Sequence, residues 1–230
     1  MKPLALLIPG LDGTGRLYYR QIASLSQGRR VRAWEFKRRP YFTFSDLVEE
    51  LAQGTSGEEP KSIAVAGESF GGTVAMHFAL AFPERIRCLV LINSFAFYTR
   101  RVRIVMGLLL APMLKWKGIR GIKDYVVDSI LAREGVAAED RQRYHEITQE
   151  VDMAAYRRRL ALVREVDLRG RLKEISVPTR ILASGRDKIV PSVSQGAFMT
   201  SRIPDAKLHV FPRAGHALLL TPGFSLADYI

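Results

Sequence analysis

Short apolar runs alternate with amphipathic stretches along the first part of the chain. The strand-like apolar runs are residues 4–8, 31–36, 63–66 and 88–93. The stretches between them with apolar positions at helical spacing are residues 16–27, 44–53 and 72–82. Ser45 is placed to cap the first turn of the second of these helices. Such alternation predicts βαβ units around a parallel sheet, and therefore an α/β fold.

The alternation stops after residue 96 and resumes near residue 178. Residues 97–171 have no strand pattern and contain only helical stretches rich in arginine and glutamate. Two further strands are predicted at residues 178–184 and 207–211, which gives a minimal sheet of about six strands. We therefore expect a core formed by residues 1–96 and 172–230, with residues 97–171 inserted as a helical lid. Loops after parallel strands overhang the place where ligands bind in such sheets.

Composition narrows the class of protein. The chain has 230 residues, 47% of them apolar, which suits one globular domain. Its single cysteine, Cys88, falls in a predicted strand and cannot form an intramolecular disulfide. No segment approaches the roughly 20 apolar residues of a membrane span, and the N-terminus lacks a signal-peptide cleavage site, so a cytoplasmic protein is expected. The net charge is +12, but no nucleic-acid-binding module is present, and we expect no nucleic-acid partner.

The motif with most chemical content is Gly-Glu-Ser-Phe-Gly-Gly at residues 67–72. It lies between a predicted strand and a predicted helix and matches the pattern Gly-x-Ser-x-Gly. A serine at such a sharp turn projects its hydroxyl above the sheet, and the flanking glycines allow the backbone to make the turn. The pattern predicts that Ser69 is a catalytic nucleophile in a strained backbone conformation.

A serine hydroxyl needs a neighbouring base, and the chain has four histidines. His77 lies about 12 Å from Ser69 along the same predicted helix, at 1.5 Å per residue. His145 falls in the charged insertion, and His209 lies inside the last predicted strand. His216 alone follows the C-terminal end of a strand, on the side of the sheet where Ser69 is expected. The sequence therefore predicts His216 as the general base.

The base needs a carboxylate, which in this architecture lies between nucleophile and base in the chain. Asp187 follows the strand at residues 178–184 through a tight loop. Asp205 precedes the final strand and so belongs to the opposite end of the sheet. The remaining candidates fall in the insertion, where solvated helix faces are expected: Asp124, Asp128, Asp140, Asp152 and Asp167. Asp187 is therefore the predicted acid.

Two N–H donors are needed for the oxyanion of a tetrahedral intermediate. One is expected from Phe70, directly after the nucleophile. The other is expected from the glycine-rich loop at residues 9–15, with Leu11 as the leading donor and Asp12 as the alternative. This loop lacks the Gly-Lys-Ser/Thr ending of a phosphate loop. The histidines lack metal-ligand spacing, so neither a metal nor a cofactor is predicted.

These motifs together resemble the α/β-hydrolase superfamily over nearly the whole chain. The sequence is most similar to a subgroup with a Pro-Gly-x-Asp-Gly-Thr-Gly loop and a Gly-Glu-Ser-Phe-Gly-Gly elbow, which includes bacterial esterase-like proteins and the hydrolase portion of phytyl ester synthases. The resemblance implies Ser69, Asp187 and His216 as a triad, with Leu11 and Phe70 as oxyanion donors. It departs from the superfamily at residues 9–10, where Pro-Gly replaces the common His-Gly pair.

The leading functional hypothesis is a cofactor-free serine carboxylester hydrolase that acts through an acyl-enzyme on small-molecule esters with short to medium acyl chains. Acyl transfer and thioester cleavage by the same residues are the alternatives, followed by a binding protein without catalysis. In the insertion, basic residues flank an apolar stretch at 105–114. Either this stretch is a packed helix with solvated flanks, or Leu109 and Leu110 line an acyl pocket with a basic rim that also contacts anionic lipid surfaces weakly. The oligomeric state does not follow from the sequence.

Overall fold

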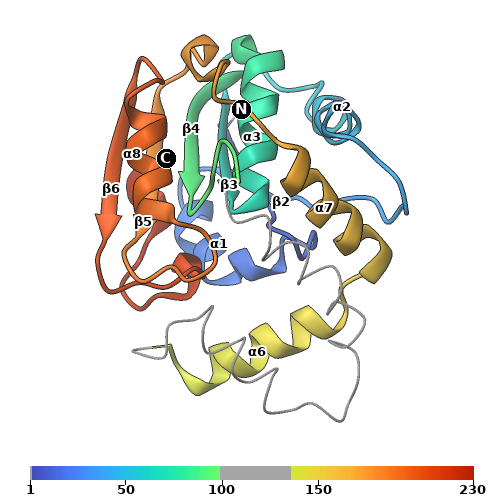
Figure 1. The fold of residues 1–230 in the computed structure, drawn as a ribbon, viewed down its shortest axis with the longest axis vertical. Helices are drawn as coiled ribbons and strands as arrows, with labels where there is room; N and C mark the ends of the chain where they lie inside the picture. Colours follow the sequence, from blue (N-terminus) through green and yellow to red (C-terminus); the bar gives the residue numbers. More distant parts are fainter. Residues whose placement is uncertain (1, 99–135) are drawn as a thin grey trace.

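A computed structural model of the chain describes residues 2–98 and 136–230. Its centre is one parallel sheet in the order β2-β1-β3-β4-β5-β6 (Figure 1). The strands are β1 (Leu4–Ile8), β2 (Arg30–Ala33), β3 (Ile63–Glu68), β4 (Ile86–Ile92), β5 (Thr179–Ser184) and β6 (Ala206–Phe211). The predicted α/β fold with a minimal six-stranded sheet is confirmed, and every strand pair is parallel.

Helices cover both faces of this sheet, because side chains that alternate along each strand face opposite sides. The α-helices are α1 (Tyr19–Ser26), α2 (Phe44–Gly54), α3 (Phe70–Ala81), α6 (Ala138–Gln149), α7 (Met153–Glu165) and α8 (Ser192–Thr200). Leu4, Leu6 and Ile8 of β1 pack in one apolar core with residues of α2, α3 and α7. Ala5 and Leu7 pack in a second core with α1 and the C-terminal turns.

Short 3-10 turns complete the described architecture. They are η1 (Arg16–Tyr18), η2 (Pro83–Arg85), η4 (Leu172–Glu174), η5 (Leu218–Leu220) and η6 (Leu226–Tyr229). The N-terminal turn of α2 departs from the sequence prediction. Thr43, not Ser45, is the N-cap: its side chain accepts from the backbone N–H of Asp46, whose carboxylate accepts in return from Thr43 N at 2.7 Å. This reciprocal capping box satisfies two backbone donors at the start of the helix. Helix α2 therefore begins directly after Thr43, and its N-cap lies two residues before Ser45, the cap expected from the sequence.

The sheet changes direction of winding between β1 and β3. From β1 the chain moves outward to β2 and returns across β1 to β3, so the loops after β1 and β3 leave neighbouring strand ends in opposite directions. The pair Ile8 and Gly67 sets the register at this edge. In doubly wound sheets ligands bind at such a switch point, beyond the carboxyl ends of the strands.

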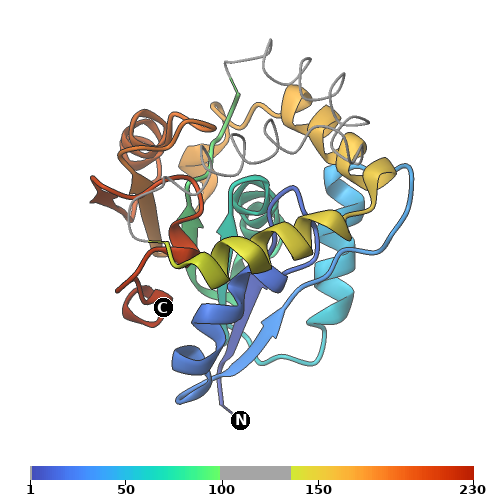
Figure 2. The ribbon, with the colours of Figure 1, turned by 90° about the horizontal axis from the view of Figure 1, so that it is seen from below.

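The described part of the insertion, residues 97–98 and 136–171, contains α6 and α7. Its two ends meet at the core, because Phe97 forms an antiparallel bridge with Asp167 and Leu168 N donates to Ala96 O at 2.8 Å. The arrows of β4 and β6 point toward the side on which α6 lies (Figure 1). Seen from that side, α6 crosses the end of the sheet (Figure 2). Helix α6 of the insertion therefore stands at the carboxyl ends of the strands.

Within the described residues, no helix is long and apolar enough to cross a membrane.

Candidate active site

Ser69 lies at the sharp turn between β3 and α3. Its backbone is left-handed, with φ 54° and ψ −120°, a region that costs a non-glycine residue about 1–3 kcal/mol. The turn is possible because its neighbours are glycines. A Cβ on Gly67 would lie 2.4 Å from Gly71 O, and one on Gly72 would lie 2.4 Å from Ser94 Oγ. The conformation is held by Ser69 N donating to Ile92 O at 2.8 Å and by Ser94 Oγ donating to Ser69 O at 2.9 Å.

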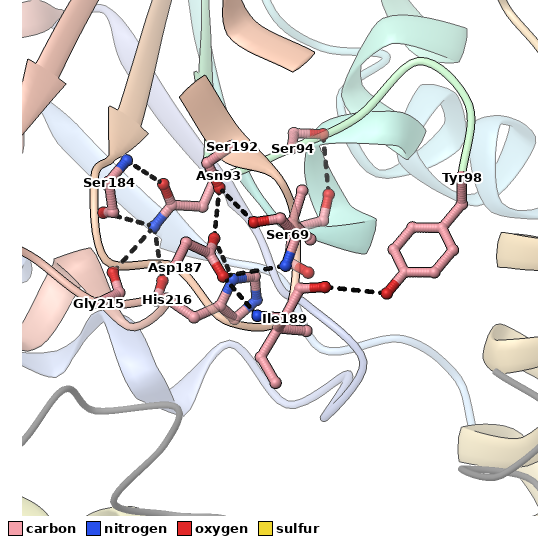
Figure 3. Close-up of polar contacts among 11 residues, drawn as sticks. Ser69, Asn93, Ser94, Tyr98, Ser184, Asp187, Ile189, Ser192, Gly215 and His216 are labelled. Atoms are coloured by element: carbon pink, nitrogen blue, oxygen red, sulfur yellow. Dashed lines mark hydrogen bonds and ion pairs between the residues drawn. The ribbon is translucent and has the colours of Figure 1, made fainter. Parts of the chain in front are cut away.

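Asp187 and His216 are brought together by loops that follow β5 and β6. His216 Nδ1 lies 2.7 Å from Asp187 Oδ2, and both residues are drawn beside Ser69 in Figure 3. Burial alone would lower the pKa of His216, but the Asp187 carboxylate, its hydrogen bond and the charge of Glu68 outweigh burial and raise that pKa. The pair therefore favours a proton on Nδ1 and leaves Nε2 to accept one.

The Asp187 carboxylate is held by donors from its own loop. Oδ1 accepts from the backbone N–H groups of Ile189 at 2.8 Å and Val190 at 2.9 Å, and Oδ2 also accepts from Ser192 Oγ. Burial acts to raise the pKa of Asp187, but His216, Ser192 and the Val190 N–H stabilise the charged form more, and the pKa is lowered. Asp187 is therefore an anion oriented toward His216.

Asn93, directly after β4, ties the two loops to the sheet. Its Nδ2 donates to His216 O at 2.7 Å and to Ser184 Oγ at 2.9 Å, and its Oδ1 accepts from Ser184 N at 2.8 Å. Asn93 is 1% exposed and has a left-handed φ of 45°. One buried amide thus fixes the end of the acid's strand and the backbone of the base (Figure 3).

The loop after β1 lies against the turn that carries Ser69. A Cβ on Gly10 would stand 3.8 Å from Ser69 Cβ and 3.6 Å from Glu68 O, and one on Gly71 would stand 2.4 Å from Pro9 O. Among the described residues, the backbone N–H groups of Leu11, Asp12 and Phe70 donate to no protein acceptor. Free backbone donors beside a serine are what an oxyanion hole requires.

The hydroxyl of Ser69 makes no hydrogen bond to any described residue. Serine–histidine contacts in ligand-free enzymes are often long and shorten when substrate binds, so this does not remove Ser69 as a candidate. Ser69 is 7% exposed and His216 is 9% exposed. Both lie just below the surface at the carboxyl ends of β3 and β6.

Glu68, the last residue of β3, is a second buried carboxyl at the site. It is 5% exposed, and its carboxyl oxygens form no hydrogen bond with any described residue. Burial raises its pKa to about 8: the neighbouring His216 acts against this shift, and Asp12 and Asp187 add to it. Glu68 therefore keeps its proton to a higher pH than an ordinary carboxyl group, next to an ionised Asp187.

The other described histidines and acids lie away from this cluster. His77 stacks on Phe44 at 4.4 Å between ring centroids, and burial followed by the charge of Arg171 lowers its pKa to about 4. His209 packs on Tyr229, and His145 lies on α6. Asp205 lies at the opposite end of the sheet, where its carbonyl accepts from Thr179 N at 2.7 Å.

The acids of the insertion that are described serve helix ends and surfaces. Asp152 caps α7, Asp140 lies on α6, and Asp167 pairs with Arg169. Asp124, Asp128, Leu109 and Leu110 lie outside the described residues. Within residues 2–98 and 136–230, no group of three or more histidine, cysteine, aspartate or glutamate side chains is placed to hold a metal ion.

Four polar residues around the site were not identified from the sequence: Glu68, Asn93, Ser192 and Arg159. Asn93 and Ser192 carry a weak signal, because each is a polar residue at the boundary of an apolar strand or helix beside a predicted site loop. Glu68 occupies a position of the Gly-x-Ser-x-Gly motif at which the pattern allows any residue. Arg159 lies on α7, where nothing in the local sequence distinguishes it from Arg157 and Arg158.

Comparisons with known proteins give the same architecture. Residues 5–228 match the sequence profile of the alpha/beta hydrolase family. The chain is 25% identical over 237 residues to a putative carbamate hydrolase RutD of Cronobacter turicensis, covering 95% of this chain and 86% of that protein. It is 26% identical over 184 residues to the pimeloyl-[acyl-carrier protein] methyl ester esterase of Nitrosomonas europaea, covering 76% of this chain and 73% of that protein.

Solved structures resemble the fold closely. An esterase from Exiguobacterium antarcticum superposes with a TM-score of 0.83 at 16% identity, over 95% of this chain and 86% of that one. The enol-lactonase of Burkholderia xenovorans superposes with a TM-score of 0.79 at 20% identity, over 94% and 85% of the two chains. With the family profile matched from end to end, the chain belongs to the alpha/beta hydrolase family.

Proposed function

We propose that the protein is a serine carboxylester hydrolase in which Ser69 is the nucleophile, His216 the general base and Asp187 the acid that orients it. One observation carries the proposal: a buried Asp187–His216 pair stands at the same end of the sheet as a serine in a strained strand-to-helix turn. A carboxylate, an imidazole and a serine in this chain order are the parts of an acyl-transfer site.

The proposed reaction has two steps. His216 Nε2 removes the proton from Ser69 Oγ as the oxygen attacks the ester carbonyl, and the resulting tetrahedral intermediate collapses to an acyl-enzyme. The imidazolium, stabilised by Asp187, returns the proton to the departing alcohol. Water then loses a proton to His216 and attacks the acyl-enzyme, which releases the acid and regenerates Ser69. The raised pKa of His216 favours the protonated form that each intermediate requires.

The proposed oxyanion donors are the N–H groups of Phe70 and Leu11. Phe70 begins α3, so its N–H also lies at the positive end of the helix dipole. Leu11 is preferred to Asp12 because it directly follows Gly10, whose Cβ position is 3.8 Å from Ser69 Cβ. Each such donor contributes about 3–4 kcal/mol to lowering the barrier in well-studied enzymes.

We propose a small-molecule ester as substrate, with residues 97–171 as a lid over the site. An esterase and an enol-lactonase are among the similar proteins, which supports an ester or lactone carbonyl as the reacting group. The position of α6 across the carboxyl ends of the strands supports the lid. Leu109 and Leu110 remain proposed acyl-pocket residues.

An ester panel tests the proposal directly. Purified protein and the Ser69→Ala variant should be compared on p-nitrophenyl esters from acetate to palmitate, on acyl-thioesters and on an aryl carbamate. Wild type should hydrolyse esters, and Ser69→Ala should lose at least about a thousandfold in kcat. Stoichiometric labelling of wild type, but not of Ser69→Ala, by a fluorophosphonate would identify the nucleophile without reference to the substrate.

The same panel separates the alternatives. Faster turnover of thioesters than of matched oxygen esters would favour a thioesterase. Ester exchange in the presence of added alcohol would favour an acyltransferase. Turnover by Ser69→Ala equal to that of wild type would overturn the assignment of Ser69. An optimum at acetate that is unchanged in Leu109→Ala and Leu110→Ala would overturn the acyl-pocket assignment.

A further inference from the structure

Arg159 is a buried cation in contact with the loop that follows β1. It lies on α7, is 2% exposed, and donates from Nε to Leu11 O at 2.8 Å and from Nη2 to Asp12 O at 3.2 Å. No carboxylate of the described residues forms an ion pair with it. Burial lowers the pKa of Arg159, and the charges of Asp12 and Asp152 act in the opposite direction. Burying a guanidinium that hydrogen-bonds only to two carbonyls costs free energy. The presence of Arg159 at this position therefore calls for a role that offsets this cost.

The contacts of Arg159 complete the fixation of three consecutive peptide groups. Gly10 O accepts from Gly13 N at 3.2 Å, which fixes the peptide between Gly10 and Leu11. Arg159 holds Leu11 O and Asp12 O, which fixes the next two peptides. The described peptides are all trans, so fixing a carbonyl also fixes the direction of the N–H on the opposite side. Arg159 therefore orients the N–H of Asp12 directly, through Leu11 O. It acts on the N–H of Leu11 indirectly: holding Asp12 O orients the Gly13 N–H, which donates to Gly10 O and so fixes the peptide that carries the Leu11 N–H.

The loop is shaped to receive the guanidinium. Gly13 has φ 75°, which favours glycine, and a Cβ there would lie 2.7 Å from Arg159 Cζ, so a side chain at this position would push the guanidinium out of its place. The Asp12 carboxylate does not pair with Arg159. It accepts from Thr14 N at 2.8 Å and from Thr14 Oγ1 at 2.6 Å, which ties down the following residues of the loop.

We propose that Arg159 is a positioning residue that reaches from the insertion to hold the Leu11–Asp12 peptides, so that the loop's oxyanion donor stays directed at the carbonyl attacked by Ser69. The inference rests on the proposed function of Ser69. It makes the oxyanion hole depend on the seating of α7. A hole built by two backbone donors on separate elements needs such a tie, because a misplacement of about 1 Å is enough to lose a hundredfold in rate.

The test compares Arg159→Met with Arg158→Met. Arg158 is a matched control: it is the neighbouring residue of α7 and also donates to a backbone carbonyl, Phe42 O at 2.6 Å, away from the loop after β1. Arg159→Met should lower kcat about a hundredfold with KM changed less than about threefold, the size of effect seen when an oxyanion donor is removed. Arg158→Met should keep kcat within about threefold of wild type.

A trifluoromethyl ketone supplies the readout that a general loss of stability would not change. Ser69 Oγ adds to the carbonyl of this inhibitor and forms a hemiketal oxyanion. The affinity of the inhibitor therefore reports on the N–H donors of the oxyanion hole. Arg159→Met should bind it at least about thirtyfold more weakly, in parallel with kcat, and Arg159→Lys should recover part of the loss. Equal affinity for wild type and a folded Arg159→Met would overturn the proposal. If Arg159→Met does not fold, Arg159→Lys with wild-type kcat and affinity would do so.

Hydrogen exchange separates failure of this inference from failure of the proposed function. If wild type hydrolyses no ester, the function fails, but the role of Arg159 in ordering the loop is still measurable. Amide exchange in a peptide covering residues 9–15 should be faster in Arg159→Met than in wild type and Arg158→Met. Exchange at the wild-type rate in that peptide would show that Arg159 does not hold the loop.

Discussion

At the scale of single residues, two carboxyl groups of the site have pKa values that are shifted in opposite directions by their surroundings. Asp187 receives hydrogen bonds from Ile189 N, Val190 N and Ser192 Oγ and faces His216, and its pKa is lowered. Glu68 is buried without such donors, and its pKa is raised to about 8. Desolvation thus determines the pKa of the carboxyl group that lacks hydrogen-bond donors, and charge pairing with hydrogen bonds determines the pKa of the one that has them. One acid is ionised to support His216, while the other resists ionisation, which limits the negative charge beside the oxyanion.

Glu68 leads to a prediction about stability against pH. Its folded-state pKa, about 8, lies above its ordinary value of 4.5, so the folded protein retains a proton that the unfolded chain releases. This stabilising contribution is complete below about pH 4.5 and is lost as the pH rises through about 8, at up to about 1.4 kcal/mol per pH unit. Glu68→Gln removes the titration and preserves the shape of the side chain.

We therefore expect the free energy of unfolding of wild type to fall relative to that of Glu68→Gln between pH 5.5 and pH 8.5. Urea unfolding of both proteins at intervals of one pH unit measures the difference. His216 and Asp187 titrate in both proteins, so the comparison isolates Glu68 to a first approximation. A difference that stays constant across this range would contradict the assignment of a buried neutral carboxyl.

At the scale of elements, the start of α2 is a sharp test of local stabilisation. Thr43 and Asp46 form the capping box, while Ser45, the residue expected from sequence, lies inside the first turn. Thr43→Ala should lower the free energy of unfolding by about 1 kcal/mol, because it leaves the N–H of Asp46 without its acceptor. Ser45→Ala is the control and should change it by less than about 0.5 kcal/mol. Urea unfolding of the two variants distinguishes them, and equal losses would place the cap elsewhere.

The incorrect prediction of Ser45 as the N-cap of α2 illustrates which features of the elements the sequence could and could not predict. Buried parallel strands such as β3 and β5 were predictable, because they are short, continuous apolar runs bounded by polar or glycine residues. Boundaries were less certain, since Thr43 and Ser45 are both good caps and only backbone geometry selects one. β2 ends at Ala33, three residues before its predicted end. Trp34 N still donates to Leu7 O of β1 at 2.8 Å, but the chain then turns away from the sheet, and Phe36 N donates to Gly13 O at 3.0 Å.

At the scale of the whole molecule, the candidate site could be predicted where chain order fixes geometry. Ser69, Asp187 and His216 follow strand ends, and all strands are parallel, so their side chains collect at one edge of the sheet. Asn93 and Arg159 act through contacts between segments far apart in sequence, as in the 148-residue separation between Arg159 and Leu11. Such contacts depend on how distant segments pack together, which for Arg159 means how the insertion returns to the core, and no local pattern encodes that.

The docking of α6 shows how this return is stabilised. Asp140 of α6 is 5% exposed and accepts from Tyr19 Oη and from Arg20 Nη1, the latter at 2.8 Å. Arg20 Nη1 also donates to Leu220 O at 3.1 Å, four residues beyond His216. Around this contact, Tyr144 and Ile147 of α6 pack in one apolar cluster with residues of η1 and η5. The insertion, the first helix and the segment that follows His216 therefore share one interface.

We expect Asp140→Asn to lower the free energy of unfolding by about 1.5–3 kcal/mol, the usual contribution of hydrogen bonds to a charged group. Glu150→Gln is the matched control, because Glu150 follows α6 and pairs with Arg16, but both side chains are about half exposed. An exposed pair contributes at most about 1 kcal/mol.

Urea unfolding gives the free energies of unfolding, and limited proteolysis within residues 136–171 reports whether α6 has detached from the core. If α6 is held mainly by its apolar contacts, the two variants will unfold at the same urea concentration. If Asp140 anchors it, Asp140→Asn alone will unfold earlier and be cut faster, and it will lose ester turnover through the displaced His216 segment.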